Sequence, residues 1–323
     1  MIIIKPDYYK EFQCIAGDCP DSCCQGWEVD ADEASLAYYA TLDKSLPIRQ
    51  RIDSVLDKDE FGNTIFTLAP KKRCPFLNSE NLCDMHIAIG GEHTPVTCRN
   101  FPRFIYDYGG TREIGISFSC PVAADLIYGH KGHLAFEQEV NSDPPALNDI
   151  DALTYMTLKK ARKDMLQLLQ DDTLTVSERL LRLLDDGTAL QKALDDYEEG
   201  GEAVAFFDVF DNPELINPEW LNRVQNGAFR PIRDAIENEH IAVYFIYKYF
   251  LQAVYDRDAL SAVKMAVVGV LVNTCFGESA WTMHLWSKET EHSQYNMDRY
   301  RRLLRTADCL TVDALKELLQ NLT

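Results

Sequence analysis

Ten cysteines stand out among the residues that can do chemistry, because eight of them fall within the first 120 positions. In a large cytosolic chain thiols are kept reduced, so dense cysteine indicates metal or redox chemistry rather than disulfides. The other two, Cys275 in an apolar segment and Cys309 in a connector, are interpreted as packing residues. The candidate metal ligands are Cys14, Cys19, Cys23, Cys24, Cys74, Cys83, Cys98 and Cys120.

The type and spacing of these cysteines narrow the kind of metal site. Soft thiolates favour zinc or iron–sulfur chemistry, and clusters typically take four of them. We expect an iron–sulfur cluster of the 4Fe-4S type, with zinc as the alternative and buried free thiols as the structural explanation. The spacings of zinc ribbons and bacterial ferredoxins are absent, as is the complete C-x3-C-x2-C run of radical S-adenosylmethionine enzymes. Because adjacent side chains diverge, Cys23 and Cys24 should differ in role.

Histidines near the cysteines offer further ligand atoms. His86 lies three residues after Cys83, and His93 follows close by. Neutral imidazole is a common metal ligand. A surface or capping role is nevertheless the simpler interpretation of each of these two histidines, so we leave both out of the predicted ligand set.

The charge of the chain bears on its partners. It carries 51 acidic and 32 basic residues, a formal net charge of −19. Such a surface repels nucleic-acid phosphates and anionic membranes, so we expect neither as a partner. It suits a cationic substrate such as a lysine side chain, although solvated acidic faces explain it equally simply. The apolar runs at residues 1–4 and 265–272 are too short for a signal peptide or a membrane span, so we expect a cytoplasmic protein.

The elements that must position the cysteines are short and punctuated by Cys, Gly and Pro. Residues 30–42 are predicted to form a helix capped by an aspartate at its start. A small hairpin is predicted around the polar turn at residues 78–81. Its two arms would bring Cys74 and Cys83 close together.

A second hairpin is predicted downstream. Residues 103–108 and 111–119 flank Gly109 and Gly110, and glycines supply the positive φ angles of a tight turn. A helix over residues 121–128 should follow directly, because proline is favoured in the first turn of a helix. These elements would place Cys120 directly before the start of that helix.

Beyond residue 150 the apolar residues recur with the period of a helix. Residues 141–149, with two adjacent prolines, are the expected linker. The chain is therefore expected to be mainly α. A small irregular α+β, cysteine-rich metal-binding lobe over residues 1–140 would pack on an all-helical lobe over residues 141–323. The expected helices of the second lobe lie at residues 153–169, 176–184, 239–255, 258–272, 295–305 and 312–322.

Several motifs at both ends of the chain carry a family resemblance. In the cysteine-rich part they read KPDYYKEFQCI (5–15), GDC (17–19), CC (23–24), GW (26–27), KRCPFL (72–77), LC (82–83), TCRNFPR (97–103) and SFSCP (117–121). Near the other end stand Glu291-His292-Ser293 and Asn296. With these motifs the chain resembles the flagellin lysine-N-methylases over most of its length. The cysteine motifs are also similar to a broader group of zinc- or iron-binding modules, and the helical part and the Glu291 stretch favour the methylase.

This resemblance implies an S-adenosylmethionine-dependent protein-lysine N-methyltransferase that acts on flagellin and carries a cysteine-ligated iron–sulfur cluster. A lysine amine has a pKa of about 10.4 and must be deprotonated before it attacks a methyl group. Glu291 and His292 match the family pattern and are the candidate catalytic residues, with a helix-end network as the structural alternative. No glycine-rich nucleotide fingerprint is evident, so no residue is assigned to the cofactor. The rival class is a non-catalytic iron–sulfur or zinc-binding interaction or redox-sensing protein.

Overall fold

The computed structural model describes residues 1–59, 61–146 and 148–323, which form two compact units. The helical unit consists of Met1–Phe12, Ile105–Ser119 and Ala123–Thr323, and the cysteine unit of Gln13–Phe104 and Cys120–Val122. The first residues of the chain and most of the second hairpin thus belong to the same compact unit as the helices. The domain boundary between residues 140 and 141 stays a prediction. Within the expected linker, residue 147 lies outside the described residues, and the others have no regular secondary structure.

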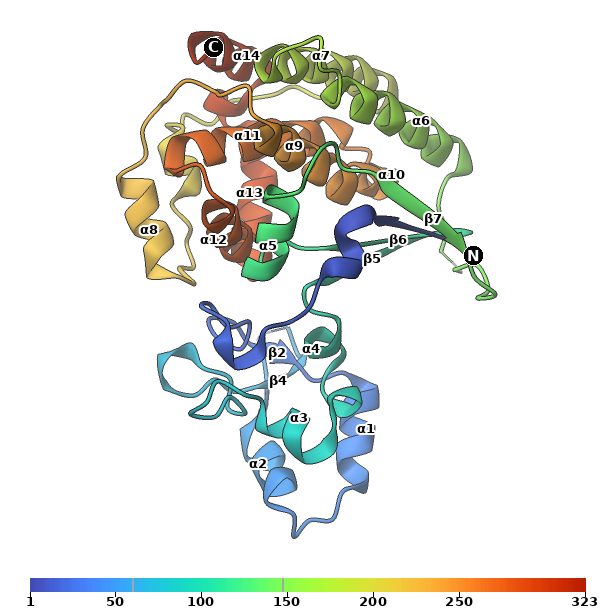
Figure 1. Ribbon diagram of the computed structural model, residues 1–323, viewed down its shortest axis with the longest axis vertical. Helices are drawn as coiled ribbons and strands as arrows, with labels where there is room; N and C mark the ends of the chain where they lie inside the picture. The colour runs from blue at the N-terminus through green and yellow to red at the C-terminus, as the bar shows by residue number, and fades with distance from the viewer. Residues whose placement is uncertain (60, 147) are drawn as a thin grey trace. The chain divides into compact units, whose positions relative to one another are not determined.

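The cysteine unit is a small α+β fold around an apolar core. Asp32 caps its first helix by accepting a hydrogen bond from Ser35 N at 3.0 Å, which confirms the predicted aspartate cap. Tyr39, Ile52 and Phe76 lie in the core and are at most 1% exposed. Its elements (Figure 1) are η2 (Ala16–Asp18), β2 (Val29–Asp30), α1 (Glu33–Thr41), α2 (Pro47–Val55), β3 (Leu56–Lys58), β4 (Thr64–Phe66), η3 (Pro70–Lys72), α3 (Asp84–Ile89), η4 (Gly91–His93) and α4 (Val96–Asn100), with a sheet ordered β2-β4-β3.

The hairpin predicted around residues 78–81 is wrong in its second arm. A single bridge joins Leu77 to Cys83, and the chain then forms α3 instead of a strand. The reason is local, because the Cys83 side chain accepts a hydrogen bond from His86 N and so caps the helix. Cys74 and Cys83 nevertheless both pack against the same apolar core.

The helical unit contains a four-stranded sheet ordered β5-β6-β1-β7. The second predicted hairpin is confirmed, with Gly109 at a φ of +58° in its turn. The central strand β1 runs parallel to β6 and antiparallel to β7, two strands that follow it by more than a hundred residues. The strands are β1 (Ile2–Pro6), β5 (Arg103–Tyr108), β6 (Thr111–Ile116) and β7 (Phe136–Val140).

After Val140 the described residues form helices and no strand, which confirms the mainly α fold with an α+β N-terminal part. The central helix α11 packs against α9 and α7. Its length and hydropathy alone would allow it to cross a membrane, but 89% of it is buried in the fold, and core helices pass the same test. The helices are α5 (Pro121–Tyr128), α6 (Ala152–Leu169), α7 (Val176–Leu194), α8 (Pro218–Gln225), α9 (Ile236–Tyr249), α10 (Ala253–Asp256), α11 (Ala259–Phe276), α12 (Ala280–Glu291), α13 (Gln294–Thr306) and α14 (Val312–Asn321), with η1 (Asp7–Glu11), η5 (Phe207–Phe210), η6 (Phe250–Gln252) and η7 (Asp308–Leu310).

Candidate functional sites

Backbone pairing sets Cys24 beside Cys74 in the cysteine unit. The amide of Cys74 donates to the carbonyl of Cys24 at 2.8 Å, and Gln25 forms an antiparallel bridge with Arg73. Residues opposite each other in an antiparallel pair have side chains on the same face. Two segments far apart in sequence thereby bring their thiols together.

Six of the eight candidate cysteines form one thiol cluster with Cys24 at its centre. The thiol of Cys24 forms hydrogen bonds with Cys23 and Cys74. It also lies within electrostatic range of Cys83 and Cys98. None of the ten cysteines of the chain is in a disulfide. The members of the thiol cluster are Cys14, Cys23, Cys24, Cys74, Cys83 and Cys98.

The remaining two candidates are placed differently. The Sγ of Cys19 donates to the carbonyl of Asp21 at 3.3 Å. Cys120 is buried and belongs to the cysteine unit together with the two residues that follow it, although the chain on either side of Cys120–Val122 belongs to the helical unit. All eight candidate ligands therefore lie in one compact unit, and six of them belong to the thiol cluster.

Secondary structure fixes two members of the thiol cluster. Cys83 is the N-cap residue of α3. Cys98 lies in α4, whose first amide, that of Val96, donates to the Asp32 carboxylate at 2.7 Å and so ties α4 to the start of α1. His93, in contrast, stacks on Tyr38 with ring centroids 3.6 Å apart. Its ring is thus used in packing.

The pKa values of the clustered thiols test whether the site fits a metal. Hydrogen bonding to Cys24 and burial raise the pKa of Cys23 and Cys74 far above that of a free thiol. Burial, with the nearby thiols, raises the pKa of Cys98 to about 12. The cluster therefore resists ionisation by itself, whereas a bound cation deprotonates the thiols that coordinate it. Sulfur donors are the type that zinc ions and iron–sulfur clusters prefer, although no three of these described thiols have their sulfur atoms all within 4.8 Å of one another.

In the helical unit, Glu291 ends α12 inside a polar cluster. Its Oε2 accepts hydrogen bonds from Lys248 Nζ at 2.5 Å and from Ser117 Oγ at 2.6 Å. Its Oε1 accepts from the Tyr249 hydroxyl and from Ser287 Oγ, both at 2.9 Å. One carboxylate thus receives four donors, which come from the end of β6, from α9 and from α12 itself.

Aromatic rings enclose the ammonium that faces Glu291. Lys248 Nζ lies 5.6 Å from the ring centroid of Tyr244 and 5.1 Å from that of Tyr249, and it donates to the Tyr244 hydroxyl at 3.2 Å. Burial lowers the pKa of Lys248, and Glu291 offsets this only in part. Burial alone would raise the pKa of Glu291, but the Lys248 charge and the hydrogen bonds outweigh it and hold that pKa below its usual value. A carboxylate beside aromatic faces is a setting that binds organic cations.

His292 follows Glu291 as the C-cap of α12, and its amide donates to the Lys288 carbonyl at 3.2 Å. Burial lowers the pKa of His292 to about 3, so the imidazole is neutral near pH 7. Ser293 caps the next helix, α13, by accepting from Asn296 N at 3.2 Å. The stretch is therefore a helix-end network as well as one wall of the Glu291 cluster. With lowered pKa values, Glu291 and His292 are suited to holding a cation rather than to accepting its proton.

Sequence reasoning missed Lys248, Tyr249 and Ser117. Lys248 follows seven largely apolar residues of α9, and its side chain is 5% exposed. A lysine is almost never fully buried unless it is paired, so a charge inside an apolar helix was the available signal. Ser117 lies within the SFSCP motif, but nothing in its local sequence indicates that it contacts the carboxylate of Glu291.

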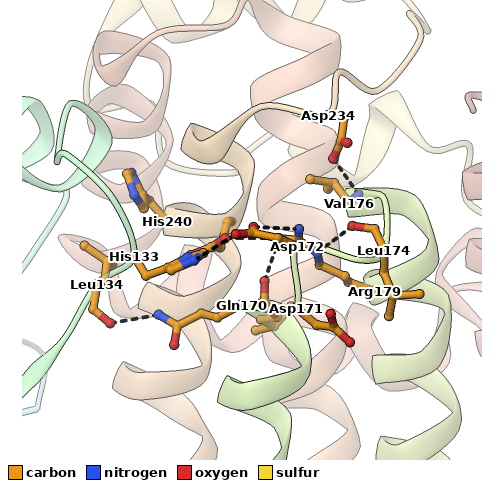
Figure 2. A network of polar contacts seen from close by, with 12 residues as sticks. His133, Leu134, Gln170, Asp171, Asp172, Leu174, Val176, Arg179, Asp234 and His240 are labelled. Atoms are coloured by element: carbon orange, nitrogen blue, oxygen red, sulfur yellow. Dashed lines mark hydrogen bonds and ion pairs between the residues drawn. The ribbon is translucent and has the colours of Figure 1, made fainter.

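A third group of ionisable side chains joins the turn between α6 and α7 to α9 (Figure 2). His133 lies 2.7 Å from Glu239 and 3.3 Å from Asp172. Arg179 contacts the same two carboxylates, at 3.0 and 3.4 Å. One potential ligand atom each from His133, Asp172 and Glu239 lie within 4.8 Å of one another. Because His133 and Arg179 already neutralise both carboxylates, we interpret the group as an ionic network rather than a metal site.

Comparison with known proteins finds distant relatives of this mainly helical, cysteine-rich chain. It is 24% identical over 140 residues to the flagellar biosynthetic protein FliU of Salmonella muenchen, a match that covers 42% of this chain and 83% of FliU. It is also 24% identical over 140 residues to the lysine-N-methylases of Salmonella typhimurium and Salmonella choleraesuis. There the match covers 42% of this chain but only 35% of each relative. No family model and no solved structure matches the chain.

Proposed function

We propose that this protein is an S-adenosylmethionine-dependent protein-lysine N-methyltransferase that acts on flagellin. The observation that carries the proposal is the distant similarity to two proteins named lysine-N-methylase. The Glu291 cluster supports it, because this cluster already holds a lysine ammonium between a carboxylate and two tyrosine rings. Flagellin as the partner and the cytoplasm as the location, where unexported flagellin and the methyl donor occur together, belong to the same proposal.

Bound S-adenosylmethionine supplies an electrophilic methyl group on a sulfonium. Methyl transfer forms a nitrogen–carbon bond and breaks a sulfur–carbon bond, so the sulfonium becomes a neutral thioether and the amine proton leaves to solvent. Desolvation favours the neutral amine, as it does for Lys248. Glu291 would orient the incoming amine in place of one of the four donors that it now accepts from, such as Lys248.

The thiol cluster would hold the iron–sulfur cluster, with zinc as the alternative metal. Because a direct methyl displacement needs no metal, we assign the metal a structural part. It would join the Cys14–Cys24, Cys74–Cys83 and Cys98 segments of the cysteine unit. Metal binding at such a site is coupled to folding.

The test is co-expression with flagellin, followed by mass measurement of its lysines and by an assay with purified proteins and S-adenosylmethionine. We expect methylated lysines, and we expect Glu291→Gln to lower turnover about 10- to 100-fold, which corresponds to ~1.4–2.8 kcal/mol. Glu278→Gln is the matched control, since Glu278 is also ion-paired and 19% exposed against 12% for Glu291, but precedes the opposite end of α12. Unchanged turnover in His292→Ala would return His292 to a structural role.

The second candidate is a non-catalytic iron–sulfur or zinc-binding interaction or redox-sensing protein. The observation that favours it is that the thiol cluster lies in a compact unit with its own apolar core. Flagellin of unchanged mass, produced beside a protein with a fully loaded metal site, would support this candidate over the methyltransferase.

A further inference from the structure

A cavity of about 250 Å³ lies in the helical unit, bounded by α11, α13 and the η6–α10 segment. Tyr249 forms part of its wall and donates its hydroxyl proton to Glu291 at 2.9 Å. A single side chain therefore separates the cavity from the Glu291 cluster. Tyr106 lies within electrostatic range of both Glu291 and Arg301, which lines the cavity.

Charged side chains of both signs line this cavity. The basic side chains come from α13, and two of the three are ion-paired with acidic residues. Arg302 is paired with Glu202, and Arg305 lies 3.9 Å from Asp258. Arg301 is exposed and makes no ion pair within 4.0 Å or hydrogen bond with any residue that the structure describes, but its charge acts on Asp256 and Tyr106. A lone guanidinium at a cavity is a receptor for a carboxylate, since its planar fork matches the two oxygens.

The acidic side chains stand at the start of α11. Asp258 caps this helix by accepting hydrogen bonds from Ser261 N at 3.0 Å and from Ser261 Oγ at 2.7 Å. Both oxygens of its carboxylate therefore already accept a hydrogen bond. Asp256 uses one oxygen to accept from Asp258 N at 2.9 Å. Its own amide also donates to this carboxylate and the charge of Arg301 acts on it, but a carboxylate has capacity for a further hydrogen bond from an ammonium group.

The cavity thus offers one cation, Arg301, and one anion, Asp256, within electrostatic range of each other and beside apolar walls that include Ala262, Met265 and Met297. An α-amino acid carries the complementary pair of charges. The volume falls just below the roughly 300–1,000 Å³ of pockets that enclose a whole drug-sized ligand. It therefore suits the amino-acid end of a larger molecule better than the whole molecule.

We propose that this cavity binds the α-amino-acid end of S-adenosylmethionine, with Arg301 receiving its carboxylate and Asp256 its ammonium. The identity of the ligand rests on the proposed function, whereas the zwitterionic chemistry of the cavity does not. Tyr249 then stands between the bound methyl donor and Glu291, which links the cavity to the cluster proposed to orient the amine.

The experiment is calorimetric titration of the full chain with S-adenosylhomocysteine, which has the same amino-acid end. We expect the Kd to rise about tenfold or more in Arg301→Ala, because a charge-assisted pair is lost, and in Ala262→Leu, because the cavity is filled. Arg182→Ala, which removes an exposed arginine of α7, is the matched control and should leave the Kd unchanged. Methylthioadenosine lacks the amino-acid end, so its binding should not respond to Arg301→Ala. Circular dichroism checks that each variant is folded.

Folded Arg301→Ala and Ala262→Leu variants that keep the wild-type Kd would overturn the proposal, as would a wild-type chain that does not bind S-adenosylhomocysteine. Flagellin methylation, measured in parallel, separates this result from the proposed function. Methylated flagellin together with unaffected Kd values contradicts the cavity and leaves the methyltransferase standing. Unmethylated flagellin together with the expected Kd changes contradicts the methyltransferase and supports the cavity.

Discussion

The ammonium of Lys248 lies 2.5 Å from Oε2 of Glu291, and the two side chains are only 5% and 12% exposed. A charge held this far from solvent depends on its partner, because the low-dielectric surroundings penalise it once it stands alone. The pair therefore couples the stability of the helical unit to the residues proposed to handle the substrate amine.

Breaking this pair from one side should be costly. We expect Glu291→Gln to lower the free energy of unfolding by about 3 kcal/mol, because Lys248 is left buried without its counter-charge. Adding Lys248→Met should recover at least half of the loss. Urea unfolding of the single and double variants measures the coupling. Glu278→Gln is the control, with a cost below about 1 kcal/mol because its partner Arg233 is 74% exposed. Strictly additive losses would contradict the pairing.

The adjacent cysteines should separate in their effects on metal binding. Cys24 lies at the centre of the thiol cluster, so Cys24→Ala should abolish metal loading and make the protein insoluble. Cys23→Ala should be milder, and Cys275→Ala, a buried thiol of α11, should leave the metal content unchanged. Elemental analysis after anaerobic purification reads out iron, zinc and sulfide. One tightly held zinc ion without iron would contradict the iron–sulfur assignment. Equal, negligible losses of bound metal in Cys23→Ala and Cys24→Ala would show that neither cysteine is a ligand.

His133 should make stability depend on pH. Hydrogen bonding to Glu239 raises the pKa of His133, and Asp172 adds to the effect. A raised folded-state pKa means that the stabilisation is fully present below the unfolded value of about 6.5 and is lost as the pH rises through the folded value. The difference in Tm between the wild type and His133→Gln should therefore shrink between about pH 6 and about pH 9. A difference that grows with pH would contradict the assignment.

Gly269 should be intolerant of a side chain. A Cβ at this position of α11 would lie 2.7 Å from the ring of Phe245 on α9, closer than real Cβ contacts occur. We expect Gly269→Ala to cost about 1–3 kcal/mol by overpacking, despite the better helix propensity of alanine. Gly110→Ala has no atom within 4 Å of the added Cβ and should change stability by less than about 0.5 kcal/mol. Denaturant unfolding compares the two.

Elements with local signals were predictable from the sequence. The Asp32 cap of α1, Pro121 in the first turn of α5 and the glycine turn before β6 each act within a few residues, and each lies where the sequence predicted it. The strands β1 and β7 were missed because they pair with each other and with β6 across long stretches of chain. No local pattern reports such pairing.

The helix that carries Glu291 was missed for a related reason. Polar side chains of α12, including Thr282, His284 and Glu289, are completely buried. The helix is therefore enclosed on all sides and lacks the apolar stripe by which a surface helix is recognised.

By itself, the sequence determined the kinds of donor atom in the cysteine unit and the helices that have a local cap or an apolar face, because these follow from residue type and near neighbours. Only the tertiary structure decided which five thiols join Cys24 in the thiol cluster and that Lys248 meets Glu291. Backbone pairing of distant segments brings Cys74 beside Cys24. The packing of α9 and α12 brings Lys248 into contact with Glu291, which lies 43 positions further along the chain. Such contacts depend on how whole elements bury their surfaces together, and no short stretch of the chain encodes them.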